Sequence, residues 1–198
     1  MQNPNQQILV ATSSGFSLLE LLIAMTITLA VMAASSTLLA TSLRTRTREN
    51  QRSNALAAAQ RALNIMSREI GNSGYGLTDN GIVVADSDND SIRIRANLDN
   101  GPDLNQANED VRFVLQEDHD VIVRVENAGT SGVLATGITG MTLLYLTVNG
   151  TPATVATAER VRIDIQVVLP AGPQQPEGLV RLTSDVALRN APTTLERF

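Results

Sequence analysis

The first 43 residues of the chain include a long apolar stretch and contain a single charged side chain. Residues 16–43 read FSLLELLIAMTITLAVMAASSTLLATSL, and residues 1–43 carry one charge, that of Glu20. The stretch holds no Pro or Gly that would interrupt a helix, and it exceeds the ~20 residues that cross a hydrocarbon core of ~30 Å. It is also longer than the ~7–15-residue apolar core of a cleaved secretory signal. The pattern therefore predicts a membrane-spanning helix.

Beyond residue 43 the apolar positions recur at steps of three and four, which is the spacing of one face of a helix. These positions are Leu56, Ala59, Leu63, Met66 and Ile70. The run GNSGYG over residues 71–76 then supplies the glycines that end helices. We expect one helix of about 80 Å, whose second half packs its apolar side on a sheet.

From about residue 81 onward the period changes to two, as in half-buried strands. The apolar members of the alternating runs are Ile92 and Ile94; Val111, Phe113 and Leu115; Val121, Val123 and Val125; Val161, Ile163, Ile165, Val167 and Leu169; and Leu182, Val186 and Leu188. The connections are rich in Asn, Asp, Gly and Pro, as turns are. The sequence predicts an α+β fold in which an antiparallel sheet packs on the second half of the helix.

The amino-acid composition excludes several classes of catalytic and metal site. The chain has no Cys and one His, which excludes thiol catalysis, disulfides and Cys-ligated zinc and predicts no cofactor. His119 is interpreted as a solvated turn residue, and no nucleophile motif predicts an enzyme. Aromatic residues make up 3% and the net charge is -5, which argues against nucleic acid as a partner.

Glu20 is the anomaly of the apolar stretch, because a carboxylate inside a membrane helix costs about 2.5–3.5 kcal/mol on insertion scales. One interpretation is that Glu20 lies near the interface and reaches water. The other is that cleavage after Gly15 frees an amine at Phe16, four residues away on the same helical face. A carboxylate in the first turn also faces the positive end of the helix dipole.

The segment around this residue reads Gly15-Phe16-Ser17-Leu18-Leu19-Glu20-Leu21-Leu22-Ile23-Ala24-Met25. It closely resembles the class III signal of type IV prepilins and type II secretion pseudopilins. The resemblance implies that a prepilin peptidase cuts after Gly15 and that Phe16 is then N-methylated. It also implies that Glu20 neutralises the terminal amine of a neighbouring subunit during assembly.

The resemblance further implies a type IV pilin-like organisation. Residues 1–15 would be the removed leader, 16–43 the transmembrane and assembly half of the helix, 44–71 its amphipathic half and 72–198 a periplasmic β-rich head. The protein would sit in the bacterial inner membrane with a single pass and then enter a pilus or pseudopilus. Its partners would be the peptidase, other major and minor pilins, the inner-membrane assembly platform and the lipid bilayer.

Two features depart from the family pattern. The leader has no Lys or Arg, and Arg44, Arg46 and Arg48 follow the apolar run, which by charge bias alone would place that end in the cytoplasm. We expect the prepilin orientation instead, with these side chains and Arg52 as a belt at the membrane edge. Binding of lipid or DNA phosphates by the same side chains is the alternative.

The distal part resembles PilW-type minor pilins in its helix exit (residues 67–76), in the run 90–95 and in the closing run 186–190. The resemblance implies a low-abundance subunit that starts assembly or caps the tip. A minor pseudopilin of type II secretion, similar to pseudopilin J, is one alternative. A tip adhesin or DNA-uptake subunit is an alternative of another class.

A short acidic loop offers the metal candidates of the head. Asp86, Asp88 and Asp90 place carboxylates at alternate positions, which can suit calcium. The loop lacks the Gly and the distal Glu of an EF-hand, so a solvated turn is the competing interpretation.

Overall fold

The computed structural model describes residues 15–104, 106–127, 129–169, 171 and 176–191 of the 198-residue chain. Within these residues, one α-helix, α1 (Leu18–Gly71), is followed by seven strands and three short 3₁₀ turns. The chain divides into two compact units, Met1–Arg46 and Thr47–Phe198, and the second contains all of the strands. The predicted α+β class is confirmed.

The helix α1 contains 54 residues, which corresponds to about 80 Å at 1.5 Å per residue. It runs without interruption because its sequence holds neither Pro nor an internal Gly. Its buried residues all lie in the second half. They are Ala59, Ala62, Leu63, Met66, Ile70 and Gly71. The apolar stripe expected there is thus the face that the head covers, with Leu56 partly buried at its start.

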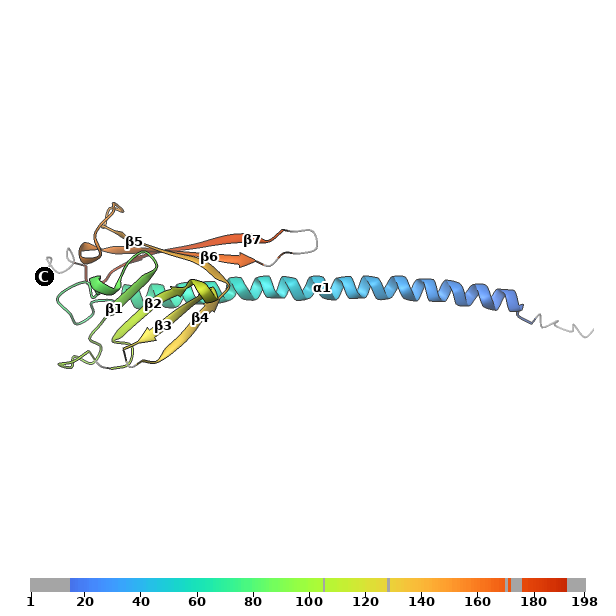
Figure 1. The fold of residues 1–198 in the computed structure, drawn as a ribbon, viewed down its shortest axis with the longest axis horizontal. Coiled ribbons are helices and arrows are strands. Elements are labelled where there is room, and N and C mark those ends of the chain that lie inside the picture. Colours follow the sequence, from blue (N-terminus) through green and yellow to red (C-terminus); the bar gives the residue numbers. More distant parts are fainter. Residues whose placement is uncertain (1–14, 105, 128, 170, 172–175, 192–198) are drawn as a thin grey trace, which may run out of the picture. The chain divides into compact units, whose positions relative to one another are not determined.

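The strands form two antiparallel sheets (Figure 1). The first has the order β1-β2-β3-β4 and consists of β1 (Ser91–Arg95), β2 (Asp110–Gln116), β3 (Val121–Glu126) and β4 (Ser131–Thr136). The second has the order β5-β6-β7 and consists of β5 (Ile138–Leu146), β6 (Arg160–Leu169) and β7 (Gly178–Ala187). The 3₁₀ turns are η1 (Val84–Asp86), η2 (Glu117–His119) and η3 (Val155–Thr157).

The expectation of a single sheet was wrong, and the alternating runs did not reveal β4 or β5. In β5 the register shifts between Ile138 and Gly140, so the buried Ile138 and Met141 are three residues apart and the period of two is lost. In β4 most residues are exposed, and only Ala135 is buried. Strands of these two kinds leave no regular alternation in the sequence.

One hydrophobic core joins both sheets to the second half of α1. Phe113 and Ile122 of the first sheet, Ile163 and Ile165 of the second, and Met66 of the helix are all fully buried. Burial of an apolar side chain of this size contributes about 1.5–3 kcal/mol. The core therefore holds both sheets on the helical stripe that the sequence predicted.

The exit from the helix depends on a close crossing of backbone. Gly81 has a φ of 70°, and a Cβ at this position would lie 2.1 Å from the backbone nitrogen of Gly74. The backbone N–H of Gly74 in turn donates to the carbonyl of Arg95 at 2.8 Å. The segment between α1 and β1 can therefore fold against the sheet only with glycine at Gly81.

Candidate functional site

The first candidate site is the start of α1. Residues 1–14 lie outside the described residues, so most of the predicted leader is not placed, whereas Gly15 and Phe16 precede the helix and are exposed. Ser17 caps the helix, because its Oγ accepts the backbone N–H of Leu19 at 3.3 Å. Ser17 was not among the predicted site residues, although the spacing Ser17-x-x-Glu20 is that of a capping box and marks a helix start in the sequence.

Glu20 lies in the first turn of α1 and is exposed. Among the described residues no Arg side chain forms an ion pair with Glu20. The carboxylate therefore stands at the positive end of the helix dipole with room for a cation. Pairing with an amine at Phe16, on this or another subunit, stays a prediction.

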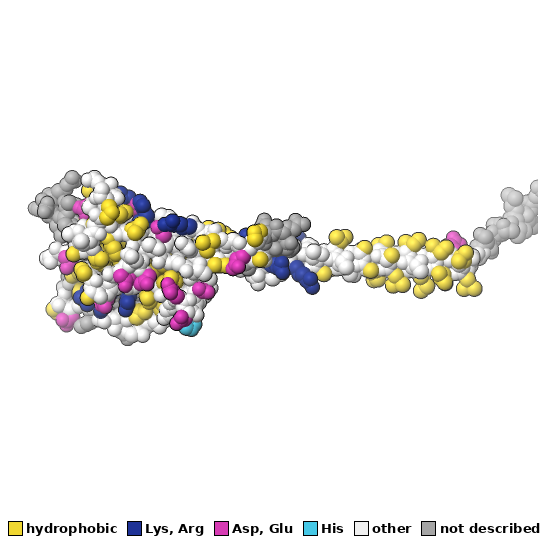
Figure 2. Space-filling view, turned by 45° about the horizontal axis from the view of Figure 1, so that its top comes forward, with side chains coloured by type: hydrophobic (Ala, Val, Ile, Leu, Met, Phe, Trp, Pro, Cys, Tyr) yellow, Lys and Arg dark blue, Asp and Glu magenta, His cyan; other side chains and the backbone are white. Residues whose placement is uncertain are grey.

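The apolar half of the helix is not covered by any described part of the chain. Its most apolar 18-residue window has a mean hydropathy of 2.1, and none of that window is buried. Figure 2 shows hydrophobic side chains along this part of the helix, and the helix is long and apolar enough to cross a membrane. A helix that is apolar on all sides needs lipid or other apolar helices around it, because water would solvate such a surface poorly.

The hydroxyl side chains in the apolar half of α1 are also suited to lipid or apolar helices around them. Seven of them donate to carbonyl oxygens three or four residues earlier in the helix. They are Thr26, Thr28, Ser35, Ser36, Thr37, Thr41 and Thr45. A hydroxyl satisfied within its own helix avoids the cost of an unpaired polar group in hydrocarbon.

The predicted belt of basic residues follows directly along α1. Arg44, Arg46 and Arg48 are exposed and Arg52 is half-buried. Figure 2 shows basic side chains where the row of hydrophobic ones ends. At helical spacing these groups point in several directions, which suits an interface more than a single bound phosphate.

Two of the three carboxylates of the acidic loop already have partners within the head. Asp86 is held by Arg93, with Oδ2 2.6 Å from Nη1. Asp88 accepts the backbone N–H groups of Asp90 and Ser91 at 3.0 and 2.8 Å. Hydrogen bonding from Asp90 lowers the pKa of Asp88 and correspondingly raises the pKa of Asp90. Within the described part of the chain no three acidic or His side chains gather to hold a metal, so calcium gains no support.

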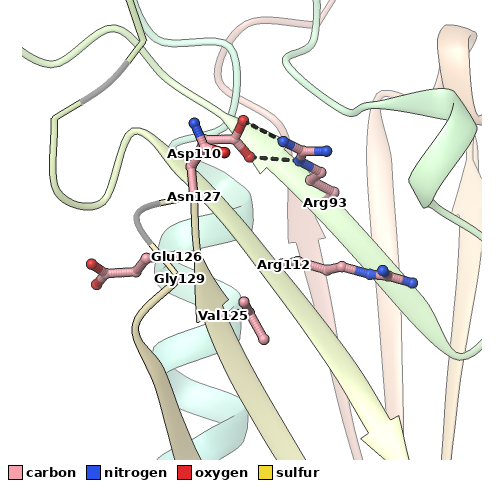
Figure 3. A pocket seen from close by; sticks show the side chains of 7 residues that line it. All are labelled: Arg93, Asp110, Arg112, Val125, Glu126, Asn127 and Gly129. Atoms are coloured by element: carbon pink, nitrogen blue, oxygen red, sulfur yellow. Dashed lines mark hydrogen bonds and ion pairs between the residues drawn. The ribbon is translucent and has the colours of Figure 1, made fainter.

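An open groove of about 270 Å³ lies on the outer face of the first sheet (Figure 3). Arg93 and Asp110 line it, joined at 2.7 Å between Nε and Oδ1, and Asp110 also accepts Arg95 at 2.9 Å. Burial works to raise the pKa of Asp110, but the two guanidinium groups outweigh it and hold that pKa below its usual range. The carboxylate is thus fixed as an anion in an ion pair.

The residues that line the groove could contact a ligand, but they do not form a catalytic arrangement. Figure 3 shows the Glu126 carboxylate directed away from Arg112, and the remaining lining residues are Val125, Asn127 and Gly129. His119 lies in the exposed turn η2, away from this set. The described lining residues include no hydroxyl or imidazole that could act as a nucleophile and its base.

The comparison with known proteins bears on the N-terminal site. A family model described as the prokaryotic N-terminal methylation motif matches residues 11–36, a range that contains Gly15, Phe16 and Glu20. No match is found among the curated proteins. The matched segment, together with a long apolar helix that is followed by antiparallel sheets, supports a protein of the type IV prepilin and pseudopilin family.

Proposed function

We propose that this protein is a minor pilin of a type IV pilus, which acts when assembly starts or at the filament tip. The observation that carries the proposal is the lone carboxylate of Glu20 in a bare apolar helix, inside the segment that matches the methylation motif. A carboxylate in such a place requires a positive partner, and a freed amine at Phe16 is the nearest that the chain can create.

Processing is the first step of this function. A prepilin peptidase cuts between Gly15 and Phe16, and Phe16 is then N-methylated. Gly15 is exposed and precedes the capped helix, which supports access by a membrane peptidase. Residues 1–15 leave as the leader, residues 16–43 hold the protein in the inner membrane, and residues 44–71 and 72–198 form the amphipathic helix and the head in the periplasm.

The mature subunit acts through contacts, without catalysis of its own. Residues 16–43 pack among the helices of other pilins once the assembly platform extracts them from the bilayer. The basic belt that starts at Arg44 stays at the phosphate level of the membrane until then, in the orientation opposite to the simple charge rule. The head presents its surfaces to neighbouring subunits.

N-terminal mass spectrometry of the protein isolated from membranes tests the proposal. We expect a mature chain that begins at N-methyl-Phe16. A Gly15→Val variant should retain its leader, whereas the neighbouring Ser14→Ala variant should be processed normally. A wild-type chain that still begins at Met1, or one cut beyond residue 43, would overturn the proposal.

A minor pseudopilin of type II secretion is the second candidate, because the matched motif is shared by pilins and pseudopilins. Cells that lack the pilus assembly platform distinguish the two. A minor pilin should remain in the inner membrane of such cells, and secretion should be unaffected when its gene is deleted. Loss of secretion on deletion would favour the pseudopilin.

A further inference from the structure

Each of the two sheets has one edge that the chain covers. Along β1, the backbone N–H of Val83 donates to Arg93 at 2.8 Å and that of Arg95 donates to Gly81 at 2.7 Å. Along β5, the N–H of Leu143 donates to Asn89 at 2.8 Å. Covering segments of this kind are a usual way to protect a sheet edge from pairing with another chain.

No described segment pairs with the opposite edge of either sheet. Within the described part of the chain, β7 pairs only with β6, and β4 pairs only with β3. Among the described residues no backbone group outside these ladders forms a hydrogen bond with either strand. The second unit of the chain therefore presents two rows of unpaired backbone groups, one on each sheet.

The edge of β7 lacks the features that normally discourage pairing. All ten of its residues pair with β6 without a register shift, and it forms a long hairpin with β6 (Figure 1). It contains no Pro, and the chain has no Lys. Proteins usually place these residues, or a bulge, on a long exposed edge. The regular edge of β7 thus indicates that another strand covers it.

The charged side chains of β7 do not shield this edge, because they are turned toward β6. The guanidinium of Arg181 lies 2.6 Å from the Asp164 carboxylate, and Asp185 is 2.9 Å from Arg160. Thr183 also donates its hydroxyl to Asp164. These pairs leave the backbone of β7 accessible on the side away from β6.

The ladder identifies which backbone groups face outward. The N–H of Leu188, just after β7, donates to the carbonyl of Glu159 at 2.8 Å, and pairing alternates along an antiparallel ladder. Even-numbered residues of β7 therefore face β6, and Thr183 faces the open edge. The same argument applies to β4. The backbone N–H of Glu126 donates to the carbonyl of Thr130, just before β4, at 2.8 Å. The backbone groups of Val133 therefore lie on the open edge of β4.

We propose that β7 of one subunit pairs with β4 of a second copy of this chain, so that the two sheets join into one. The strand β4 is the other open edge among the described residues. Its register with β3 shifts between Val133 and Ala135, but all six of its residues are uncharged, so it brings no charge that would repel Arg181 or Asp185. Pairing of two different edges is a head-to-tail contact, which can repeat along a filament. Pairing of β7 with itself would close after two copies.

This contact involves only the head, so it does not depend on cleavage at Gly15 or on the minor-pilin role. Failure of the contact and failure of the proposed processing are therefore separate results. The occupant is specified as a second copy, and another protein in its place is one of the outcomes that would overturn the inference.

Disulfide trapping tests the contact, because the chain has no native Cys. Full-length Thr183→Cys and Val133→Cys proteins are mixed in detergent and oxidised mildly. Facing positions on paired strands bring Cβ atoms within about 5.5 Å, which a disulfide can bridge. We expect a mixed disulfide dimer at roughly tenfold or more above a control mixture with Val148→Cys, because paired strands raise the effective thiol concentration. Val148 is exposed and lies outside both edges.

A proline substitution on the open edge of β7 is the second test of the contact. Arg181→Pro in the Thr183→Cys protein removes an outward N–H and should reduce the mixed dimer to the control level, whereas Arg181→Ala should not. Circular dichroism checks that both variants keep their strands. A dimer formed by Thr183→Cys alone would show a closed pair of β7 strands. That result, trapping only with another protein, or no dimer above the control, would overturn the inference.

Discussion

Arg124 of β3 ties the first sheet to the helix through Glu69 of α1, with Nε 3.0 Å from Oε2. The two side chains are only 13% and 20% exposed, and Arg124 also pairs with Glu126 and donates to Asn108 at 2.6 Å. Burial alone would lower the pKa of Arg124, but the hydrogen bonds that its guanidinium donates to Glu126 and Glu69 outweigh burial and raise that pKa. The guanidinium therefore remains charged at the border of the core.

Glu69→Gln should destabilise the head, because it leaves a largely buried guanidinium with one carboxylate fewer. We expect a loss of about 1.5–3 kcal/mol in the free energy of unfolding. Urea unfolding of the full chain in detergent, followed by circular dichroism, measures it. Glu49→Gln is the control, since Glu49 is an exposed carboxylate of the same helix. Equal midpoints for the two variants would contradict this role of the ion pair.

The sequence predicted the helix well because its signals are local. The apolar run, the stripe through Leu63 and Met66 and the glycines after residue 70 each act within a few residues. The pairing of Glu69 with Arg124 was not predictable in this way, since the two residues are 55 positions apart and meet only when the sheet packs on the helix. The same holds for the division of the strands into two sheets.

The N-terminal site stays a prediction, but its sequence signal is also local. Gly15, Phe16 and Glu20 lie within one helical turn or two of each other, and the matched motif covers them. The sequence could not show that Asp86, one of the calcium candidates, pairs with Arg93 of β1, which neutralises that carboxylate. The spacing of acidic residues in the sequence does not show which of them will form an ion pair with an arginine from another strand.

The stability of the head should fall at acidic pH through Asp110. Its pKa is lowered in the folded state, whereas the pKa of an unfolded Asp is about 3.9. The stabilisation is therefore fully present above that value and is lost as the pH falls through the folded pKa. Asp110→Asn should lower stability at neutral pH by about 3 kcal/mol and flatten the acid limb of the curve.

Urea midpoints measured between neutral and strongly acidic pH check this behaviour. Asp118→Asn is the matched control, because Asp118 is an exposed carboxylate in the turn η2. Its curve should follow that of the wild-type protein. An Asp110→Asn protein with the wild-type pH dependence would show that the pairs with Arg93 and Arg95 contribute nothing to the acid response.

Gly81→Ala should disrupt the helix exit far more than Gly150→Ala. Both glycines have positive φ values, 70° and 81°, so both variants bear a backbone cost of about 1–2 kcal/mol. At Gly81 the added Cβ would also lie 2.1 Å from the nitrogen of Gly74, whereas nothing lies within 4 Å of it at Gly150. Thermal melts should show a clearly larger loss for Gly81→Ala. Similar losses would mean that the crossing can relax.

Glu20→Ala should leave membrane insertion intact and impair incorporation into filaments. Removal of the carboxylate lowers the cost of insertion by about 2.5–3.5 kcal/mol, so the membrane fraction should hold at least the wild-type amount. Assembly should fail because the amine at Phe16 then enters an apolar helix bundle without its counter-charge. Immunoblots of membranes and sheared filaments measure both quantities. Ser17→Ala is the control, since it removes the helix cap but keeps the carboxylate. Normal incorporation of Glu20→Ala would show that another group compensates the amine.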